Sequence, residues 1–484
     1  MNPGEDLIPH SNDPFAIEVR GFDHIPDAER NMALRQVDHL WVGTSVNLFS
    51  FALGAIAITM GLNLWLALAA SVLGNLPYVY LALGSIVTVR AGLPVSTLTR
   101  AAFGMRGNLV NALLSWLVSV AFEVINIVFG VEALLALFAI LGWQSPGNAG
   151  KLFAVIIQLG LCGGIAVLGH ATMVWFQRVF ATLVGAALIV VMSYAATRVD
   201  WRHAAVPHAH MTTATTLAAF ITATAVIASN PLSFLFNGPD WVRYLPSATP
   251  GRPIFRHVFW SSFMTCVAIT MMGAACATLG DMSDPVAGLK PFVPPGLFVV
   301  YIFAVVAGSL ANNVPTYYSS GLSLQAVGLK LHRYAATILD VALSAAISLY
   351  ILFVRDFTTA LNDFIALLVV WVGPFGGVWI CDALLRRYRY DFVGIHSKER
   401  AAGRYWGWHG LNASGLIAMA AGMTAAALTM MSPLFDGPIA TALGGTDLSW
   451  IVGLPVASLS YWLLWTRGSS AVAAVTSGAS GSGT

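Results

Sequence analysis

The chain has 484 residues, of which 57% are hydrophobic and only 10% are charged, and its formal net charge is +2. Soluble domains carry about 25% charged residues, so this composition excludes a protein whose whole surface faces water. The basic residues are spread over many loops, which gives no support to nucleic-acid binding.

The two ends of the chain are predicted to lie outside the membrane. Residues 1–39 are polar and contain no basic-then-apolar leader with a small-residue cleavage site, so we expect no signal peptide to be removed. Residues 468–484 are rich in Ser, Gly and Ala, which is typical of a disordered tail.

Between these ends, twelve apolar runs are near or above the about 20 residues that cross a bilayer. In chain order they are residues 40–60, 64–89, 111–141, 152–168, 173–196, 213–236, 258–279, 297–327, 335–354, 360–385, 411–431 and 450–465. The sequence therefore predicts an all-α integral membrane protein with twelve transmembrane helices. The Gly-x-x-x-Gly spacings at 160–164 and 373–377 predict close helix contacts.

The basic residues predict the orientation, because cytoplasmic loops are enriched in Lys and Arg. If residues 1–39 are cytoplasmic, 19 of the 24 basic residues fall on the cytoplasmic side. We therefore expect both termini in the cytoplasm. The exceptions, on the outer side, are Lys151, Arg198, Arg202, Lys290 and Arg355.

The first and sixth apolar runs share a polar interruption. Residues 46–51 read Val-Asn-Leu-Phe-Ser-Phe and residues 229–234 read Ser-Asn-Pro-Leu-Ser-Phe, so an Asn precedes Ser-Phe by the same spacing in both. Secondary transporters bind substrate near the bilayer midplane between discontinuous helices at matching positions of two repeats. Unwound backbone is tolerated there only where it lines a cavity. The repeated pattern therefore predicts two broken helices around a transport site.

Four stretches resemble the nucleobase:cation symporter-1 family, in particular its bacterial and fungal purine-cytosine permease branch. Residues 21–30 (GFDHIPDAER) are similar to its N-terminal motif, and 122–130 (FEVINIVFG) to its third-helix pattern. Residues 239–246 (PDWVRYLP) resemble the close of its sixth helix, and 312–325 its polar eighth helix. The resemblance implies a five-plus-five inverted-repeat, leucine-transporter-like core at 40–390, two additional helices at 391–467, and alternating access driven by H⁺ or Na⁺.

A planar nucleobase needs aromatic rings against its faces and amide groups at its polar edge. Phe122 and Asn126 lie one helical turn apart and offer both on one face. The alternative for each is structural: a phenyl ring in lipid or core, or an amide joining two helices. By resemblance, the candidate substrate-binding residues are Asn47, Phe122, Asn126, Phe234, Asn312, Asn313 and Thr316.

The sequence departs from the family pattern at some of these candidate substrate-binding residues. Many members carry an indole where Phe122 and Phe234 align, and many have Asn at the position of Thr316. The substrate therefore stays open among nucleobases such as cytosine, adenine and hypoxanthine, and alternatively uracil, allantoin, hydantoin, nucleosides, thiamine or pyridoxine.

The coupling ion can be predicted from the side-chain oxygens available at the expected ion sites. By resemblance, a sodium site would use backbone carbonyls of Gly43 and Val46 and hydroxyls at positions 310 and 311. Leu310 and Ala311 offer no side-chain oxygen, which favours protons over sodium, although a shift of the alignment by one residue would bring the Ser309 hydroxyl to one of these positions. Glu123 is the candidate proton carrier because an intramembrane carboxyl is a functional hypothesis by default, and a structural hydrogen bond is its alternative.

No enzyme chemistry is indicated. The chain has no His-Glu-x-x-His spacing and no glycine loop for phosphate, and its four cysteines have no metal-ligand spacing, so we expect no cofactor or metal. We predict a proton-coupled nucleobase importer of the cytoplasmic membrane, whose partners are a small solute and the lipid bilayer.

Overall fold

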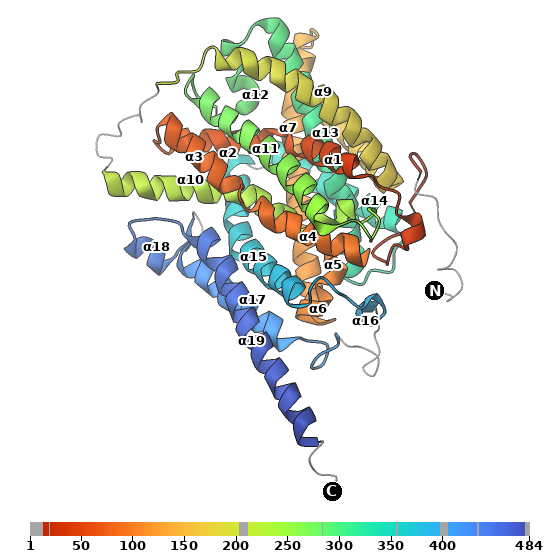
Figure 1. Ribbon diagram of the computed structural model, residues 1–484. Coiled ribbons are helices and arrows are strands. Elements are labelled where there is room, and N and C mark those ends of the chain that lie inside the picture. Colours follow the sequence, from red (N-terminus) through yellow and green to blue (C-terminus); the bar gives the residue numbers. More distant parts are fainter. Residues whose placement is uncertain are drawn as a thin grey trace.

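The computed structural model describes residues 13–18, 20–202, 212–282, 284–354, 357–396, 405–432 and 435–479, and it is almost entirely helical (Figure 1). Two short strands form an antiparallel pair in which Met431 faces Asp436. The elements are η2 (Asp27–Glu29), α1 (Leu34–Ser45), α2 (Leu48–Thr59), α3 (Leu64–Asn75), α4 (Tyr78–Ala91), α5 (Val95–Leu98), α6 (Arg100–Phe103), α7 (Gly107–Ile140), α8 (Gly147–Leu168), α9 (His170–Ala196), α10 (Thr213–Ser233), η3 (Phe234–Phe236), η4 (Gly238–Val242), α11 (Gly251–Ala277), α12 (Pro285–Gly288), η5 (Lys290–Phe292), α13 (Pro295–Ala326), α14 (Arg333–Phe353), α15 (Phe357–Leu385), α16 (Phe392–His396), α17 (Ala413–Leu428), β1 (Met431–Ser432), β2 (Phe435–Asp436), α18 (Pro438–Ala442) and α19 (Ser449–Ala479).

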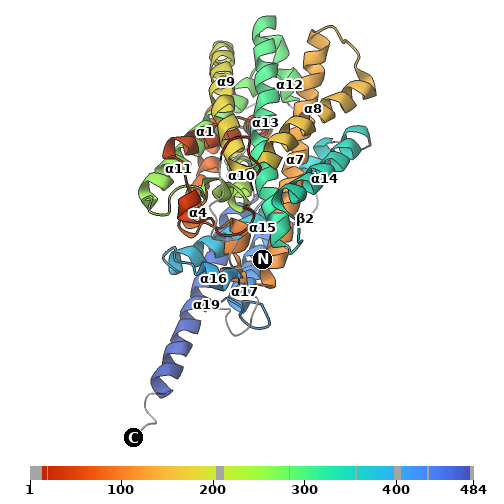
Figure 2. The ribbon, with the colours of Figure 1, turned by 90° about the vertical axis from the view of Figure 1, so that its right-hand side faces the viewer.

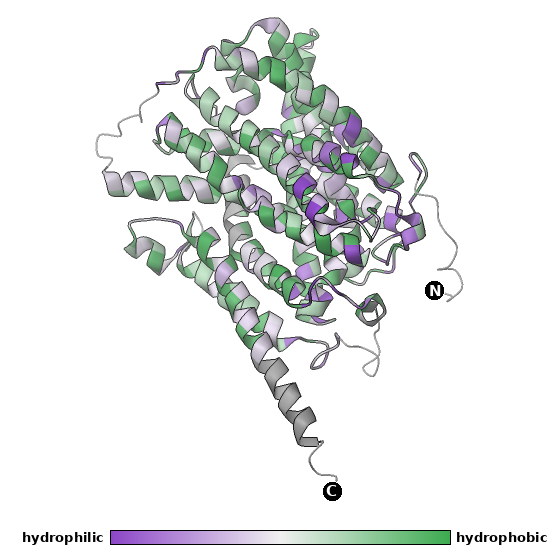
Figure 3. Ribbon diagram, in the orientation of Figure 1, coloured by the Kyte–Doolittle hydropathy of each residue, from purple (hydrophilic) through white to green (hydrophobic). Residues whose placement is uncertain are grey.

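The helices confirm the predicted class of membrane protein. Within the described part of the chain, eight helices are long and apolar enough to cross a bilayer, and the bent pair α1 and α2 would make nine. The remaining predicted runs fall in α15, α17 and α19, so each of the twelve runs lies in a helix, but twelve crossings are not established. Apolar residues cover most helix surfaces, whereas hydrophilic residues gather near the N-terminal segment (Figure 3).

The first predicted break is present between α1 and α2. The two helices meet at an angle of 54° across Val46 and Asn47. The Asn47 side chain accepts a hydrogen bond from the Ser50 amide at 2.8 Å and donates one to the Thr44 carbonyl at 3.0 Å. One amide group therefore caps the start of α2 and satisfies a carbonyl at the end of α1.

The second break lies later in the chain than the pattern predicted. Asn230 and Pro231 are still inside α10, which ends at Ser233, and Phe234 begins the short 3₁₀ helix η3. Proline lacks the N–H that would bond one turn back, but the helix can continue for a few residues beyond it. The regular helix then gives way to η3 and η4.

Two glycines bring α2 and α11 into direct backbone contact. A Cβ on Gly54 would overlap the carbonyl of Thr270, and a Cβ on Gly273 would overlap the carbonyl of Phe51. Small residues permit this close approach of membrane helices. The α2 side of the first break is therefore held tightly against α11.

One of the two Gly-x-x-x-Gly predictions is wrong. Gly160 and Gly164 have open space beside them, because this face of α8 is exposed. Gly377, by contrast, packs against the Leu454 carbonyl of α19, and Gly373 also faces Leu454. The spacing at 373–377 is thus a true helix contact.

The C-terminal helices lie at one end of the molecule, with α17 and α19 packed on each other and on α15 (Figures 1 and 2). Helix α19 continues to Ala479, past residue 468 where we predicted a disordered tail. Alanine, the best helix former, is frequent in this stretch, which accounts for the difference.

Candidate functional site

A small cavity lies where the two broken segments meet α7 and α13. Its volume is about 10 Å³, which is room for about one water molecule. The site is therefore closed in this conformation. The lining residues are Asn47, Phe49, Phe122, Asn126, Asn230, Ser233, Phe234, Asn237, Asn312 and Thr316.

The structure brings six of the seven predicted substrate residues to this cavity, and Asn313 is the exception. Sequence reasoning missed Phe49 and Asn237 as site residues, and did not assign Asn230 or Ser233. Three of these four belong to the two interrupted motifs themselves, so the repeated pattern was the signal that could have identified them.

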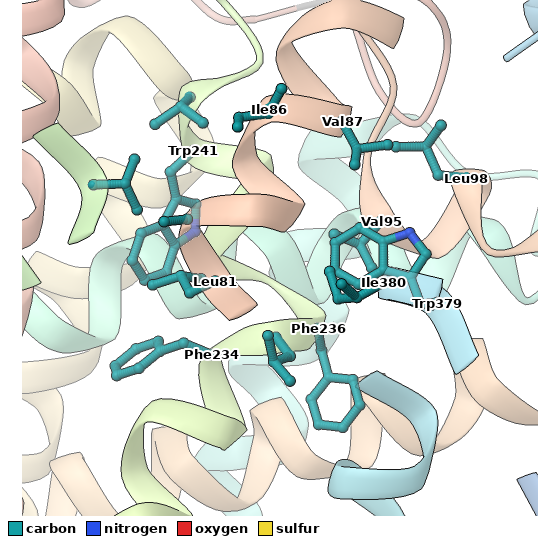
Figure 4. Close-up of a cluster of buried hydrophobic side chains, with 14 of the residues drawn as sticks. Leu81, Ile86, Val87, Val95, Leu98, Phe234, Phe236, Trp241, Trp379 and Ile380 are labelled. Carbon is teal, nitrogen blue, oxygen red and sulfur yellow. The ribbon is translucent and has the colours of Figure 1, made fainter. Parts of the chain in front are cut away.

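Three phenyl rings line the cavity. Phe122 of α7 makes an edge-to-face contact with Phe49 of α2, with ring centroids 5.6 Å apart. Phe234 packs in the same manner on Trp41 at 5.6 Å and on Trp241 at 5.7 Å, so it belongs both to the cavity and to the buried aromatic cluster beside it (Figure 4). Trp41 and Trp241 also contact each other, with ring centroids 4.7 Å apart, so the three rings form one buried cluster.

A chain of amide groups joins α7 to the end of α1. Asn126 donates to the side-chain oxygen of Asn312 at 2.7 Å, and Asn312 donates to the Thr44 carbonyl at 2.8 Å. The Asn126 side-chain carbonyl has no hydrogen bond within the described residues. Asn126 therefore keeps one acceptor that a bound solute could use, whereas the Asn312 amide is committed to the protein.

Asn237 lies between η3 and η4, on the other side of the second break. Its side-chain oxygen is buried and has no partner within the described residues. Buried polar atoms are nearly always hydrogen-bonded, so an unpartnered amide facing a cavity indicates a place for a polar ligand. Thr316, in contrast, donates its hydroxyl to the Asn312 carbonyl one turn earlier on α13.

Glu123 and Asn313 are directed away from the cavity. The Glu123 side chain is fully buried near the Asp340 carboxyl of α14 and the Ser320 hydroxyl of α13, and its two oxygens form no hydrogen bond within the described residues. Asn313 donates to the Glu123 backbone carbonyl at 3.2 Å. Asp340 also accepts a hydrogen bond from the Trp116 indole at 2.7 Å. The structure thus pairs two buried carboxyls behind α7, and the sequence had indicated only one of them.

The N-terminal segment is attached to the helices through the buried side chain of Glu18. The Glu18 carboxylate accepts hydrogen bonds from the hydroxyls of Tyr244 and Tyr318 and lies 3.5 Å from Arg243 and 3.6 Å from Arg333. Burial by itself would raise the pKa of Glu18, but the charges of Arg333 and Arg243 outweigh it and hold the pKa below its ordinary value. One ionised carboxylate therefore ties the segment to two transmembrane elements.

The predicted sodium positions meet where α1 ends against α13. Leu310 and Ala311 are buried there and supply no side-chain oxygen, and a Cβ on Gly308 would press on the Val46 carbonyl. The residues present do not fit the predicted pair of hydroxyl ligands.

Comparison with known proteins identifies the family. The sequence model described as "Permease for cytosine/purines, uracil, thiamine, allantoin" matches residues 24–453, most of the chain. The chain belongs to this permease family. Its members are transporters rather than enzymes, which confirms that prediction.

Two relatives of this permease are similar over almost its whole length. A Bacillus subtilis protein described as a purine-cytosine permease, YxlA, is 23% identical, and the match covers 93% of this chain and 96% of YxlA. The purine-cytosine permease FcyB of Emericella nidulans is 21% identical over 93% of this chain and 88% of its own.

Solved structures show the same fold. Mhp1, a nucleobase-cation-symport-1 family transporter in a closed conformation with bromovinylhydantoin bound, superposes with a TM-score of 0.72 at 18% identity, covering 94% of both chains. The inward-facing conformation of Mhp1 superposes with a TM-score of 0.67 at 18% identity, covering 93% of this chain and 96% of Mhp1. The predicted inverted-repeat fold class is therefore confirmed.

Proposed function

We propose that this permease imports a nucleobase, such as cytosine, adenine or hypoxanthine, across the cytoplasmic membrane by proton symport with alternating access. The cavity between the two breaks supports the substrate class, because it presents phenyl rings together with side-chain oxygens of Asn126 and Asn237 that have no hydrogen bond within the described residues. A planar ring with a polar edge matches this combination. The two purine-cytosine permease relatives agree with it.

The closed cavity supports alternating access. A base cannot enter a space of about 10 Å³, so binding requires the walls to separate. On the α1 side, both the aromatic cluster and the Glu18 ion pairs must open for release. The distribution of basic residues supports assigning this side, with both termini, to the cytoplasm.

The carboxyl pair supports proton coupling. Glu123 and Asp340 are fully buried, and neither forms an ion pair within the described residues. Two adjacent carboxylates repel each other, and a proton shared between them relieves that repulsion. Glu123 lies three residues before Asn126 on α7, so the proposed solute and proton sites share this helix.

Uptake of labelled cytosine, adenine and hypoxanthine tests the proposal, in cells that lack their own nucleobase carriers. We expect saturable uptake that collapses with a protonophore. Absence of uptake for all three bases would reject the substrate assignment. A hydantoin is the second candidate, because Mhp1 binds bromovinylhydantoin in the same fold, so labelled hydantoin belongs in the same assay.

Replacement of one carboxyl tests the coupling. We expect Glu123→Gln to retain equilibrating uptake but to lose accumulation against a gradient, because the shared proton has no site. Glu132→Gln is the matched control, since Glu132 is on the same helix but exposed. Unchanged, protonophore-sensitive accumulation by Glu123→Gln would assign Glu123 a structural role.

A further inference from the structure

A glutamine side chain occupies the junction where the sodium site was predicted. Gln177 of α9 is fully buried, and its Nε2 donates to the Ala311 carbonyl of α13 at 2.5 Å. At its other end, a Cβ on Gly43 would overlap the Gln177 Oε1, so the carboxamide lies directly on the backbone of α1. It therefore contacts two of the four positions that a sodium ion would join.

On the side of α13, the Gln177 side chain interacts with the backbone as a bound cation would. The –NH₂ group carries partial positive charge and binds a backbone carbonyl, as a metal ion would. On the other side, the amide oxygen Oε1 lies against Gly43 of α1, so the side chain fills this position without binding a carbonyl there. Unlike an ion, the amide is covalently attached and cannot leave during the transport cycle.

The remaining amide atom is unusual. Gln177 Oε1 is buried and has no hydrogen bond within the described residues. The amide is therefore not held by a full set of partners, as an ordinary structural glutamine would be. Its position between Gly43 of α1 and Ala311 of α13 is what the amide has in place of a full set of hydrogen bonds.

We propose that the Gln177 carboxamide takes the place of a coupling sodium ion between α1 and α13, so that sodium neither binds at this junction nor drives transport. Gln177 acts as a positioning residue: it fixes the end of α1, and through it the first break beside the cavity. The inference rests on the proposed transport function, but it concerns the ion and not the solute.

Thermal unfolding of the purified protein tests the junction without any substrate. At equal ionic strength, we expect the wild-type midpoint to be the same in sodium chloride and in choline chloride. Gln177→Glu should gain a sodium response at pH 8 to 9, with a midpoint at least about 2 °C higher in sodium, because an ionised carboxylate adds an anionic oxygen where the amide stood. At pH 5 to 6 the neutral acid still donates to Ala311, and the difference should vanish.

Transport supplies the second readout. Gln177→Leu removes both polar atoms, and we expect base uptake to fall at least tenfold. Gln158→Leu is the matched control, because Gln158 is also buried and bonds Ser309 on α13 at 3.2 Å, whereas the three atoms nearest a Cβ on Gly43 all belong to Gln177. It should retain uptake within about threefold.

Three results would overturn the inference: a wild-type protein that sodium stabilises over choline, a folded Gln177→Glu variant that ignores sodium throughout pH 5 to 9, or normal uptake by Gln177→Leu. If no base is transported, the proposed function fails while the unfolding data still decide the inference. If base uptake requires sodium, the substrate stands and the inference fails.

Discussion

At the break between α1 and α2, the Asn47 side chain satisfies backbone groups at both helix ends, whereas Asn237, beyond the break after α10, has a buried side-chain oxygen with no partner within the described residues. The Asn47 side chain accepts a hydrogen bond from the Ser50 amide and donates one to the Thr44 carbonyl. Asn237, beyond the second break, keeps a buried oxygen unbonded. Asn47 therefore stabilises the break that it caps, and we propose that Asn237 receives the ligand.

The largest effect is expected where α7 connects the first break to the cavity. Asn126→Ala removes the free carbonyl and the hydrogen bond to Asn312, so saturable uptake should be lost, by about a hundredfold or more, while membrane abundance is retained. Radiolabelled uptake normalised to surface protein measures this. Asn108→Ala is the control, since Asn108 is a buried amide of the same helix that bonds Ser96 away from the cavity. Near-normal uptake by Asn126→Ala would remove this residue from the site.

The second break ends at a buried carboxyl whose titration should be visible in stability. Burial raises the pKa of Asp240 to about 7, although the Val95 amide donates to it. A carboxyl with a raised pKa binds its proton more tightly in the folded state, so stability should fall as pH rises from about 4 to about 7, by up to about 4 kcal/mol. Thermal midpoints across this range measure the slope.

Asp240→Asn should flatten that slope. Asp27→Asn is the control, because a hydrogen bond from Ser247 lowers the pKa of Asp27. The contribution of Asp27 to stability is therefore lost only as the pH falls toward acid. The decrease in stability from pH 5 to 7 should be the same in this variant as in the wild type. An unchanged slope in Asp240→Asn would assign the pH dependence to another group.

Removing the cap at the first break should cost stability. Asn47→Ala leaves the Ser50 amide and the Thr44 carbonyl without this partner, and we expect a loss of about 2 to 3 kcal/mol in unfolding free energy. Asn63→Ala is the matched control, because Asn63 caps α3 by the same 2.8 Å bond but outside the cavity, and about 1 kcal/mol is expected there. An equal loss in both variants would show that the first break is no more than an ordinary helix start.

The smallest effect is expected at the second break. Asn237→Ala removes no hydrogen bond of the side chain within the described residues, so the thermal midpoint should hold while KM for the base rises about tenfold, the equivalent of one polar contact. Asn230→Ala should behave in the opposite way, because the Asn230 amide donates to Ser50 at 3.2 Å and joins α10 to α2. If Asn237→Ala changed the midpoint but not KM, the two breaks would not differ in purpose.

The sequence by itself determined the class of protein, the positions of its helices and most of the cavity. Long apolar runs are stable as helices that cross a bilayer. A polar interruption within such a run must line a cavity or contact protein, so Asn47 and Phe234 could be recognised from the residue pattern alone. Resemblance to the family added Asn126, one turn after Phe122 on α7, and Thr316, one turn after Asn312 on α13, because spacing within a helix is independent of how the helices pack.

Only the tertiary structure decided which polar atoms remain free. Whether an amide is committed depends on neighbours from distant segments: Asn312 finds Thr44, Gln177 finds Ala311, and Glu123 turns from the cavity toward Asp340. These partners lie more than a hundred residues apart in the chain, and no local periodicity encodes them. Helix packing brings them together, and it is this packing that separates a structural amide from one that can bind a solute.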